Sequence, residues 1–243
     1  QTLTPPSIKT WCQLKNISVY QPEKLKDETD KSPLLQDYDL AIVASYGKII
    51  PENILNKPRY GFLNVHPSLL PLYRGPSPIE SQLRDGAEQI GMSIMKLDKE
   101  MDHGPILAQN IIPVTSLDTA GTLEIKAGQM GGQMLVEIIE HYINGNLIPK
   151  EQDHSSATFC KFIEKSEGEI KLTDDINSIK NKYRAFTPWP GIFFFHQHSD
   201  KNIRVKINRF NLNENTLDNC IESVTPEGKS EISWADFKHG YTI

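Results

Sequence analysis

The sequence is poor in cysteine and has no excess of positive charge. Its 243 residues include three cysteines, Cys12, Cys160 and Cys220, which lie far apart and form no CxxC pair. Scattered thiols of this kind are typical of core residues in a reducing compartment, so we expect a cytoplasmic protein. The net charge of −5 argues against a general polyanion-binding protein, because such proteins usually carry a basic excess.

Long apolar runs are also lacking, since none is long enough to span a bilayer. Hydrophobic residues make up 38 % and charged residues 23 % of the chain, which is ordinary for a globular protein. The opening residues, QTLTPPSIKT, form a loop and enter a helix near Pro6 with no strand before it. Because α/β domains seldom begin in this way, we expect N-terminal strand–helix units to be missing from this sequence.

Strands and helices alternate over residues 1–150. Four apolar runs predict buried strands: residues 39–47, 61–66, 91–97 and 106–114. Three other segments predict helices: residues 51–57, 77–86 and 118–143. Gly86 is expected to close the second helix and Asp118 to cap the third. The pattern predicts an α/β domain with an open, mainly parallel, Rossmann-like sheet and helices on both faces.

The pattern changes after residue 150. Residues 151–185 predict a polar linker followed by a helix at about 174–186. Short β-like runs then follow: residues 191–198, 201–210, 217–224 and 232–237. Short strands with polar connections suggest a small barrel or sandwich, and of these we expect an OB-like β-barrel domain over residues 186–243.

The stretch NVHPSLLPLYRG ends a predicted strand on two polar residues. Asn64 and His66 are two residues apart, so their side chains project to the same side of the strand. They lie at its carboxyl end, where open α/β sheets bind ligands. Pro67 and Pro71 stiffen the loop that follows. These positions leave two alternatives open: a functional pair, or a core histidine with an asparagine that caps a turn.

A second segment, KLDKEMDHGPIL, leaves the predicted strand 91–97 at its carboxyl end, which we expect at the same edge of the sheet as His66. It carries three acids: Asp98, Glu100 and Asp102. No Ser or Cys is placed as a nucleophile, since Ser68 lies in a loop without a strained elbow. The combination therefore indicates general acid–base chemistry with hydrogen-bond donors for an oxyanion.

Residues 64–107 resemble the catalytic core of the formyltetrahydrofolate-dependent formyltransferases. The Asn–x–His pair, the SLLPxYRGxxP loop and Asp102 all match that superfamily, although Gly104-Pro105 stands where it usually has Gly-Asp. The likeness is closest to the methionyl-tRNA formyltransferases, because LTPPSIK, ASYGKIIP and RAFTPWPG are similar to segments of that family.

The resemblance implies direct formyl transfer from 10-formyltetrahydrofolate to the α-amine of initiator methionyl-tRNA, for translation initiation. Asn64 and protonated His66 would hold the oxyanion of the tetrahedral intermediate. Asp102 would favour the protonated form of His66 and help move a proton from the amine to the leaving N10. No metal is implied, and we expect a monomer that does not bind membranes.

The resemblance also implies the binding residues. The folate would lie along the YGKII turn and the SLLP loop: Tyr46, Gly47, Lys48, Ile49, Ile50, Ser68, Leu69, Leu70 and Pro71. The tRNA would be held by basic residues of the linker and β-domain: Lys165, Lys180, Lys182, Arg184, Lys201, Arg204 and Lys206. A charge run of this kind is otherwise only a solvated face.

Several alternatives stay open. The same core serves sugar-nucleotide N-formyltransferases, glycinamide ribonucleotide formyltransferase and formyltetrahydrofolate hydrolase. The chain could also be an inactive tRNA-binding remnant. His196–x–His198 is the one paired histidine spacing, and it favours a solvated strand face over a metal site because no acid or cysteine accompanies it.

Overall fold

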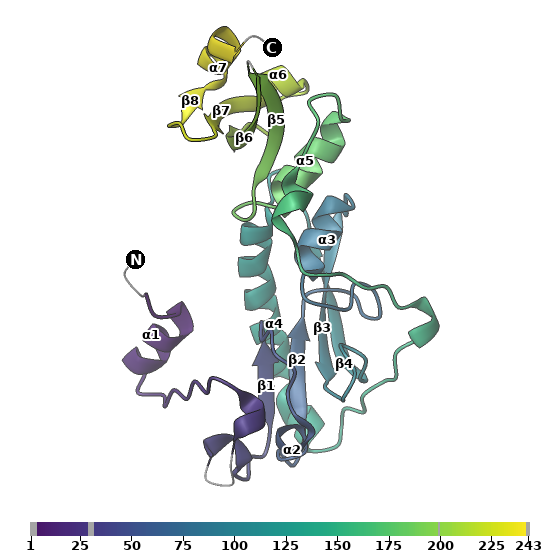
Figure 1. Ribbon diagram of the computed structural model, residues 1–243. Coiled ribbons are helices and arrows are strands. Elements are labelled where there is room, and N and C mark those ends of the chain that lie inside the picture. Colours follow the sequence, from purple (N-terminus) through teal and green to yellow (C-terminus); the bar gives the residue numbers. More distant parts are fainter. Residues whose placement is uncertain (1–3, 29–31, 199, 242–243) are drawn as a thin grey trace. The chain divides into compact units, whose positions relative to one another are not determined.

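The computed structural model describes residues 4–28, 32–198 and 200–241 (Figure 1). The chain divides into two compact units: Gln1–Ala41 with Gly47–Phe62, and Ile42–Tyr46 with Leu63–Ile243. No helix among the described residues is long and apolar enough to cross a membrane.

The first unit consists mainly of short helical segments: α1 (Ser7–Leu14), η1 (Leu25–Asp27), η2 (Pro33–Leu35) and α2 (Glu52–Leu55). Its small core is formed by Leu25, Leu35 and Ile54. The helices predicted after Pro6 and at residues 51–57 are therefore confirmed, although the second is shorter than expected.

The first sheet has four strands in the order β1-β2-β3-β4: Ala41–Ala44, Phe62–His66, Gln89–Lys96 and Ile106–Pro113. All four predicted strands are thus confirmed. β1 and β2 run the same way in Figure 1, but β2–β3 and β3–β4 are antiparallel. The sheet is therefore mixed, and the expectation of a mainly parallel sheet is wrong.

The connection between β2 and β3 explains this direction. α3 (Pro78–Arg84) has seven residues and spans about 10 Å. An eight-residue strand such as β3 spans about 26 Å, so α3 alone is too short to return the chain along the full length of such a strand. β3 instead begins beyond the end of β2 and returns alongside it, with His66 opposite Ser93. As predicted, Gly86 follows the end of α3, with φ 80°.

The long helix α4 (Ala120–Ile143) packs against β3 and β4. Its buried residues recur at helical spacing, and an added Cβ at Gly131 would lie 2.4 Å from a methyl of Val65. The expected cap is wrong by one residue. Thr119 is the N-cap, because its hydroxyl accepts the N–H of Thr122. Asp118 instead binds Lys126 and other side chains nearby.

The segment after α4 holds three helical pieces: η3 (His154–Ser156), η4 (Lys165–Gly168) and α5 (Ile176–Ala185). α5 confirms the helix predicted near 174–186 and packs on α3. Isolated bridges join this segment to other strands and loops: Arg74 with Phe159, Ile106 with Lys150, and Glu169 with Phe193.

The second sheet is antiparallel, in the order β5-β6-β7-β8: Ile192–His198, Lys201–Phe210, Ile221–Pro226 and Ile232–Ser233. Two short helices interrupt the predicted strands, α6 (Leu217–Cys220) and α7 (Trp234–Tyr241). α7 contributes Phe237, whose ring packs on Phe194. In the described part of the chain this is an open sheet, so the expected closed barrel is not seen.

Candidate active site

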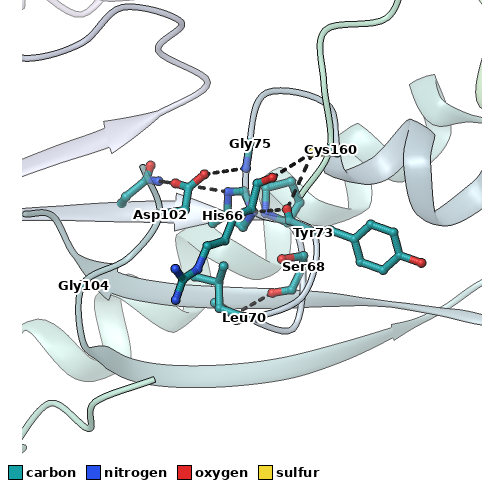
Figure 2. A network of polar contacts seen from close by, with 12 residues as sticks. His66, Ser68, Leu70, Tyr73, Gly75, Asp102, Gly104 and Cys160 are labelled. Carbon is teal, nitrogen blue, oxygen red and sulfur yellow. Dashed lines mark hydrogen bonds and ion pairs between the residues drawn. The ribbon is translucent and has the colours of Figure 1, made fainter. Parts of the chain in front are cut away.

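Asn64, His66 and Asp102 come together at one point, and Figure 2 shows His66 beside Asp102. The Asn64 Nδ2 donates to Asp102 Oδ1 at 3.2 Å. The His66 Nδ1 lies 3.6 Å from the same oxygen. The predicted trio therefore forms one cluster, and a single carboxylate oxygen contacts both members of the Asn–x–His pair.

The route by which Asp102 arrives differs from the expected one. The carboxyl end of β3 lies beside the start of β2, with Lys96 opposite Leu63. It does not lie at the edge where β2 ends, so the predicted shared edge is wrong. The loop between β3 and β4 folds back over β2, and the Lys96 N–H donates to Pro105 O at its base (2.9 Å). Asp102, at φ 50°, lies in this loop.

His66 is 4 % exposed, and acceptors face both of its ring nitrogens. Nε2 donates to Tyr73 O at 3.0 Å, because a carbonyl oxygen can only accept. Nδ1 faces the Asp102 carboxylate. A substrate oxygen can receive Nε2–H only by replacing Tyr73 O, so this hydrogen bond has to open during a reaction.

The other oxygen of Asp102 is held by backbone, since the Gly75 N–H donates to Oδ2 at 2.8 Å. Gly75 has φ 121°, and an added Cβ would lie 2.3 Å from Cys160 O. Only glycine suits this backbone position. Asn64 is half-buried and uses one of its two amide hydrogens on Asp102. The second is available for a developing oxyanion.

The predicted SLLP loop lies against the sheet. Ser68 and Leu70 are buried, at 0 % and 3 % exposure. An added Cβ at Gly91 would lie 2.1 Å from Leu69 N, so the loop backbone passes directly over β3. Leu69 and Pro71 are partly exposed. Backbone groups and these two side chains are therefore the accessible parts of the loop.

The predicted YGKII turn is split between the two units. Tyr46 belongs to the second unit and is 44 % exposed. In the first unit, Lys48 Nζ donates to Glu23 O at 2.9 Å. Lys48 and Ile49 line an open groove of about 290 Å³ there. Gly47 is exposed and Ile50 partly buried in the same unit. A role of this turn in folate binding stays a prediction.

The predicted tRNA-binding residues fall into two groups. Some are engaged within the protein: Lys182 Nζ donates to Glu169 O (2.7 Å), and Arg184 donates to Thr115 O (3.2 Å). The Arg204 guanidinium stacks on the Phe193 ring at 3.8 Å. The other group is exposed or half-exposed: Lys165, Lys180, Lys201 and Lys206. The second group is the better placed for phosphate contacts.

Sequence reasoning missed three residues around the cluster: Arg74, Gln152 and His154. Arg74 Nη2 donates to Gln152 Oε1 (2.7 Å) and to His154 Nδ1 (2.9 Å). The sequence offers no signal for this, since Gln152 is 78 positions away from Arg74. His154 also stacks on His103, with ring centroids 3.9 Å apart.

Cys160 borders the same cluster and is buried. Burial raises the pKa of its thiol. A thiol that stays protonated is a poor nucleophile, so Cys160 is a packing residue here, as predicted from the sequence.

His196 and His198 pack with aromatic side chains. The His196 Nε2 binds Tyr241 O at 2.7 Å, and both rings lie against Tyr241. The expectation of a solvated strand face is therefore wrong for His196. Among the described residues, no group of three or more His, Cys, Asp and Glu is placed to hold a metal ion.

Most of the sequence is similar to known proteins. Residues 6–139 match the family model "Formyl transferase", and residues 162–219 match "Formyl transferase, C-terminal domain". The sequence is 36 % identical over 264 residues to a methionyl-tRNA formyltransferase of Dictyoglomus thermophilum, covering 99 % of this chain and 85 % of that protein. It is 40 % identical over 195 residues to one of Chloroflexus aurantiacus, covering 79 % of this chain and 63 % of that protein.

Solved structures share the fold. A 4-N formyltransferase from Francisella tularensis matches with a TM-score of 0.66 at 21 % identity, covering 83 % of this chain and 81 % of that one. A methionyl-tRNA formyltransferase from Clostridium thermocellum matches with a TM-score of 0.58 at 19 % identity, covering 80 % and 78 %. The family-model and sequence matches show that the chain belongs to the formyl transferase family.

Proposed function

We propose that this protein transfers the formyl group of 10-formyltetrahydrofolate to the α-amine of initiator methionyl-tRNA. The convergence of Asn64, His66 and Asp102 on one another is the observation that carries the proposal. The choice of acceptor is supported by the 36 % identity to a methionyl-tRNA formyltransferase over nearly the whole chain.

In the proposed reaction the amine attacks the formyl carbon, and negative charge develops on the formyl oxygen. The free amide hydrogen of Asn64 and the Nε2–H of His66 are the donors for this oxyanion. One donor of this kind contributes about 3 kcal/mol to transition-state stabilisation. The carbon–N10 bond then breaks, and N10 receives the proton that the amine loses. Asp102, through a water molecule, is the group proposed to carry that proton.

The folate is proposed to bind along the loop 68–71. Backbone groups of Leu69 and Pro71 can contact a pterin edge, while their partly exposed side chains supply apolar contacts. The family's use of a formylated folate is consistent with a sugar 3-N-formyltransferase that was solved with 5-N-formyltetrahydrofolate and shares this fold at a TM-score of 0.62.

The tRNA is proposed to contact Lys165, Lys180, Lys201 and Lys206, which are at least partly exposed. Arg204 and Lys206 are two residues apart on β6, so their side chains lie on the same face of the sheet. Phe195, which pairs with Arg204, lies on this face and is 47 % exposed. A cationic face with an accessible aromatic ring suits phosphate contacts and base stacking.

A sugar-nucleotide N-formyltransferase is the second candidate, because the solved sugar 3-N-formyltransferase shares the fold at a TM-score of 0.62. The test is formyl transfer from 10-formyltetrahydrofolate to methionyl-tRNA, uncharged tRNA and an amino-sugar nucleotide. We expect formyl-methionyl-tRNA as the product, formed about 10²- to 10³-fold more slowly by the His66→Ala variant. Transfer to the sugar alone would establish the second candidate, and hydrolysis without transfer would contradict both.

A further inference from the structure

Gln152 lies beside the catalytic cluster, and its amide is fully used. The side chain is 6 % exposed. Its NH₂ group donates to the backbone oxygens of Asp102 (2.9 Å) and Gly104 (2.7 Å). Its Oε1 accepts from Nε (3.2 Å) and Nη2 (2.7 Å) of Arg74. The amide therefore has one allowed orientation. If it were flipped, its NH₂ group would face the donors of the Arg74 guanidinium, and its oxygen would face the two backbone carbonyl oxygens.

Arg74 extends this restraint to the carboxylate itself. Its guanidinium is buried, and its backbone N–H donates to Thr158 O at 2.9 Å. The next residue, Gly75, donates its N–H to Asp102 Oδ2 (Figure 2). The dipeptide Arg74–Gly75 thus holds Asp102 twice: directly at the carboxylate, and through Gln152 at the main-chain carbonyl.

The backbone of Asp102 is of a kind that needs such support. Its φ of 50° lies in the left-handed region, which is unfavourable for residues other than glycine, although aspartate tolerates it better than most. The two carbonyls that Gln152 binds flank His103, so the loop is held on both sides of one residue. An added Cβ at Gly104 would lie 2.0 Å from Lys96 O, which leaves the loop no room to shift toward β3.

We infer that Gln152 is a positioning residue for the reaction. Together with Arg74 it directs the Asp102 carboxylate toward Asn64 and His66 without touching the substrate. Its kinetic consequence rests on the proposed function, whereas its effect on Asp102 does not. Displacement of a catalytic group by about 1 Å can reduce a rate on the order of 100-fold.

Two variants separate hydrogen bonding from packing. Gln152→Leu removes all four hydrogen bonds. Gln152→Glu keeps an oxygen that accepts from Arg74. Its second carboxylate oxygen replaces the NH₂ group, so it cannot donate to the carbonyl oxygens of Asp102 and Gly104. We expect both variants to lower kcat for formyl transfer about 10- to 100-fold. The KM values for folate and methionyl-tRNA should stay within about 3-fold of wild type, because the residue does not bind either ligand.

Asp118→Asn is the matched control. It disrupts another buried polar cluster, at the start of α4, that does not reach Asp102. It should lower the free energy of unfolding and leave kcat unchanged. If Asp118→Asn reduces kcat as much as the Gln152 variants do, general loss of stability explains all three, and the inference is wrong.

A second readout needs no activity. In ¹H–¹⁵N NMR spectra of the free protein, the chemical shift of the Gly75 amide should report its hydrogen bond to the Asp102 carboxylate. We expect the Gly75 chemical shift to change in Gln152→Leu, while the amide shifts of β5–β8 stay unchanged. If the leucine variant does not fold, Gln152→Glu is used for the same measurement. An unchanged Gly75 resonance overturns the inference whatever the kinetics. A shifted resonance in a protein that transfers no formyl group upholds it and contradicts only the proposed function.

Discussion

Ser93 and Gln109 face each other across β3 and β4, and a hydrogen bond of 2.9 Å joins their side chains. Gln109 also donates to Leu70 O (2.9 Å). Ser93 Oγ donates to Ser68 O (2.6 Å) and accepts the Leu70 N–H (3.2 Å). The pair therefore fastens the loop 68–71 to the sheet at three backbone atoms.

Gln109→Leu should weaken folate binding, because it removes the hydrogen bond to Leu70 O and frees the loop. One such bond contributes about 1 kcal/mol, so we expect the KM for 10-formyltetrahydrofolate to rise roughly 5- to 10-fold. The kcat should change little. Steady-state kinetics with varied folate measure this. Gln133→Leu, at an exposed site on α4, is the control; a folate KM that is the same in both variants would contradict the assignment of the loop.

Asn64→Ala and His66→Ala should each lower kcat by about 10²- to 10³-fold, because both remove a donor to charge that develops in the transition state. The folate KM should change far less. Kinetics at saturating folate and methionyl-tRNA check this, with exposed His141→Ala as the control. Near-normal turnover in either variant would remove that residue from the chemistry.

Asp102→Asn should fold and bind both substrates but turn over slowly. The asparagine cannot accept from Asn64, Gly75 and His66 as a carboxylate does. Steady-state kinetics with both substrates measure this, with circular dichroism as the check on folding. Near-normal turnover in the variant would exclude Asp102 from the proton transfer.

Asp118 should make folding stability depend on pH. Burial raises the pKa of Asp118, but hydrogen bonds from Lys126, Thr115 and Thr122 outweigh it and hold the pKa well below the usual range. A carboxylate with a lowered folded-state pKa stabilises the fold above its unfolded pKa, near 4, and this contribution is lost as the pH falls.

Asp118→Asn should therefore destabilise the protein by about 2 kcal/mol at pH 7. The difference from wild type should shrink below about pH 4. Urea unfolding at pH 7 and at pH 3 measures both values. A difference that is constant with pH would mean that the charge of Asp118 is not what stabilises the cluster.

The exposed basic residues should govern salt-dependent tRNA binding. Replacing Lys180, Lys201 and Lys206 by alanine should raise the KM for methionyl-tRNA and leave that for folate unchanged. The log–log slope of tRNA affinity against salt should fall by about 0.7 to 0.9 for each phosphate that the variant no longer neutralises. Lys229→Ala, on the β7–β8 turn, is the control. If the slope of the triple variant equals that of wild type, the tRNA is held elsewhere.

The elements of the fold could be predicted, but the direction of β3 could not. Apolar runs predicted all four strands of the first sheet, because buried strands consist mainly of hydrophobic residues. Strand direction depends on how far α3 and its loops carry the chain, which no local pattern records. The sequence predicts a strand up to residue 237, yet residues 234–241 form α7, since packing of Trp234 and Phe237 outweighs their β-propensity.

Of the cluster, Asn64, His66 and Asp102 could be predicted because they lie in two compact motifs. The shared sheet edge expected for them is wrong, and the trio forms because the β3–β4 loop folds back. Arg74 and Gln152 could not be paired in advance. Gln152 donates to two carbonyl oxygens that are distant in sequence, and no periodic pattern of residues indicates such a contact.

Gln152, Thr158 and Cys160 lie in the stretch between residues 139 and 162, which neither family match includes. This stretch nevertheless pairs with Arg74 and holds the Asp102 loop. On the proposed function, this stretch therefore supports the carboxylate that the reaction uses. A chimaera that takes its C-terminal domain from a relative should keep its formyl transfer rate only if the junction falls after Cys160.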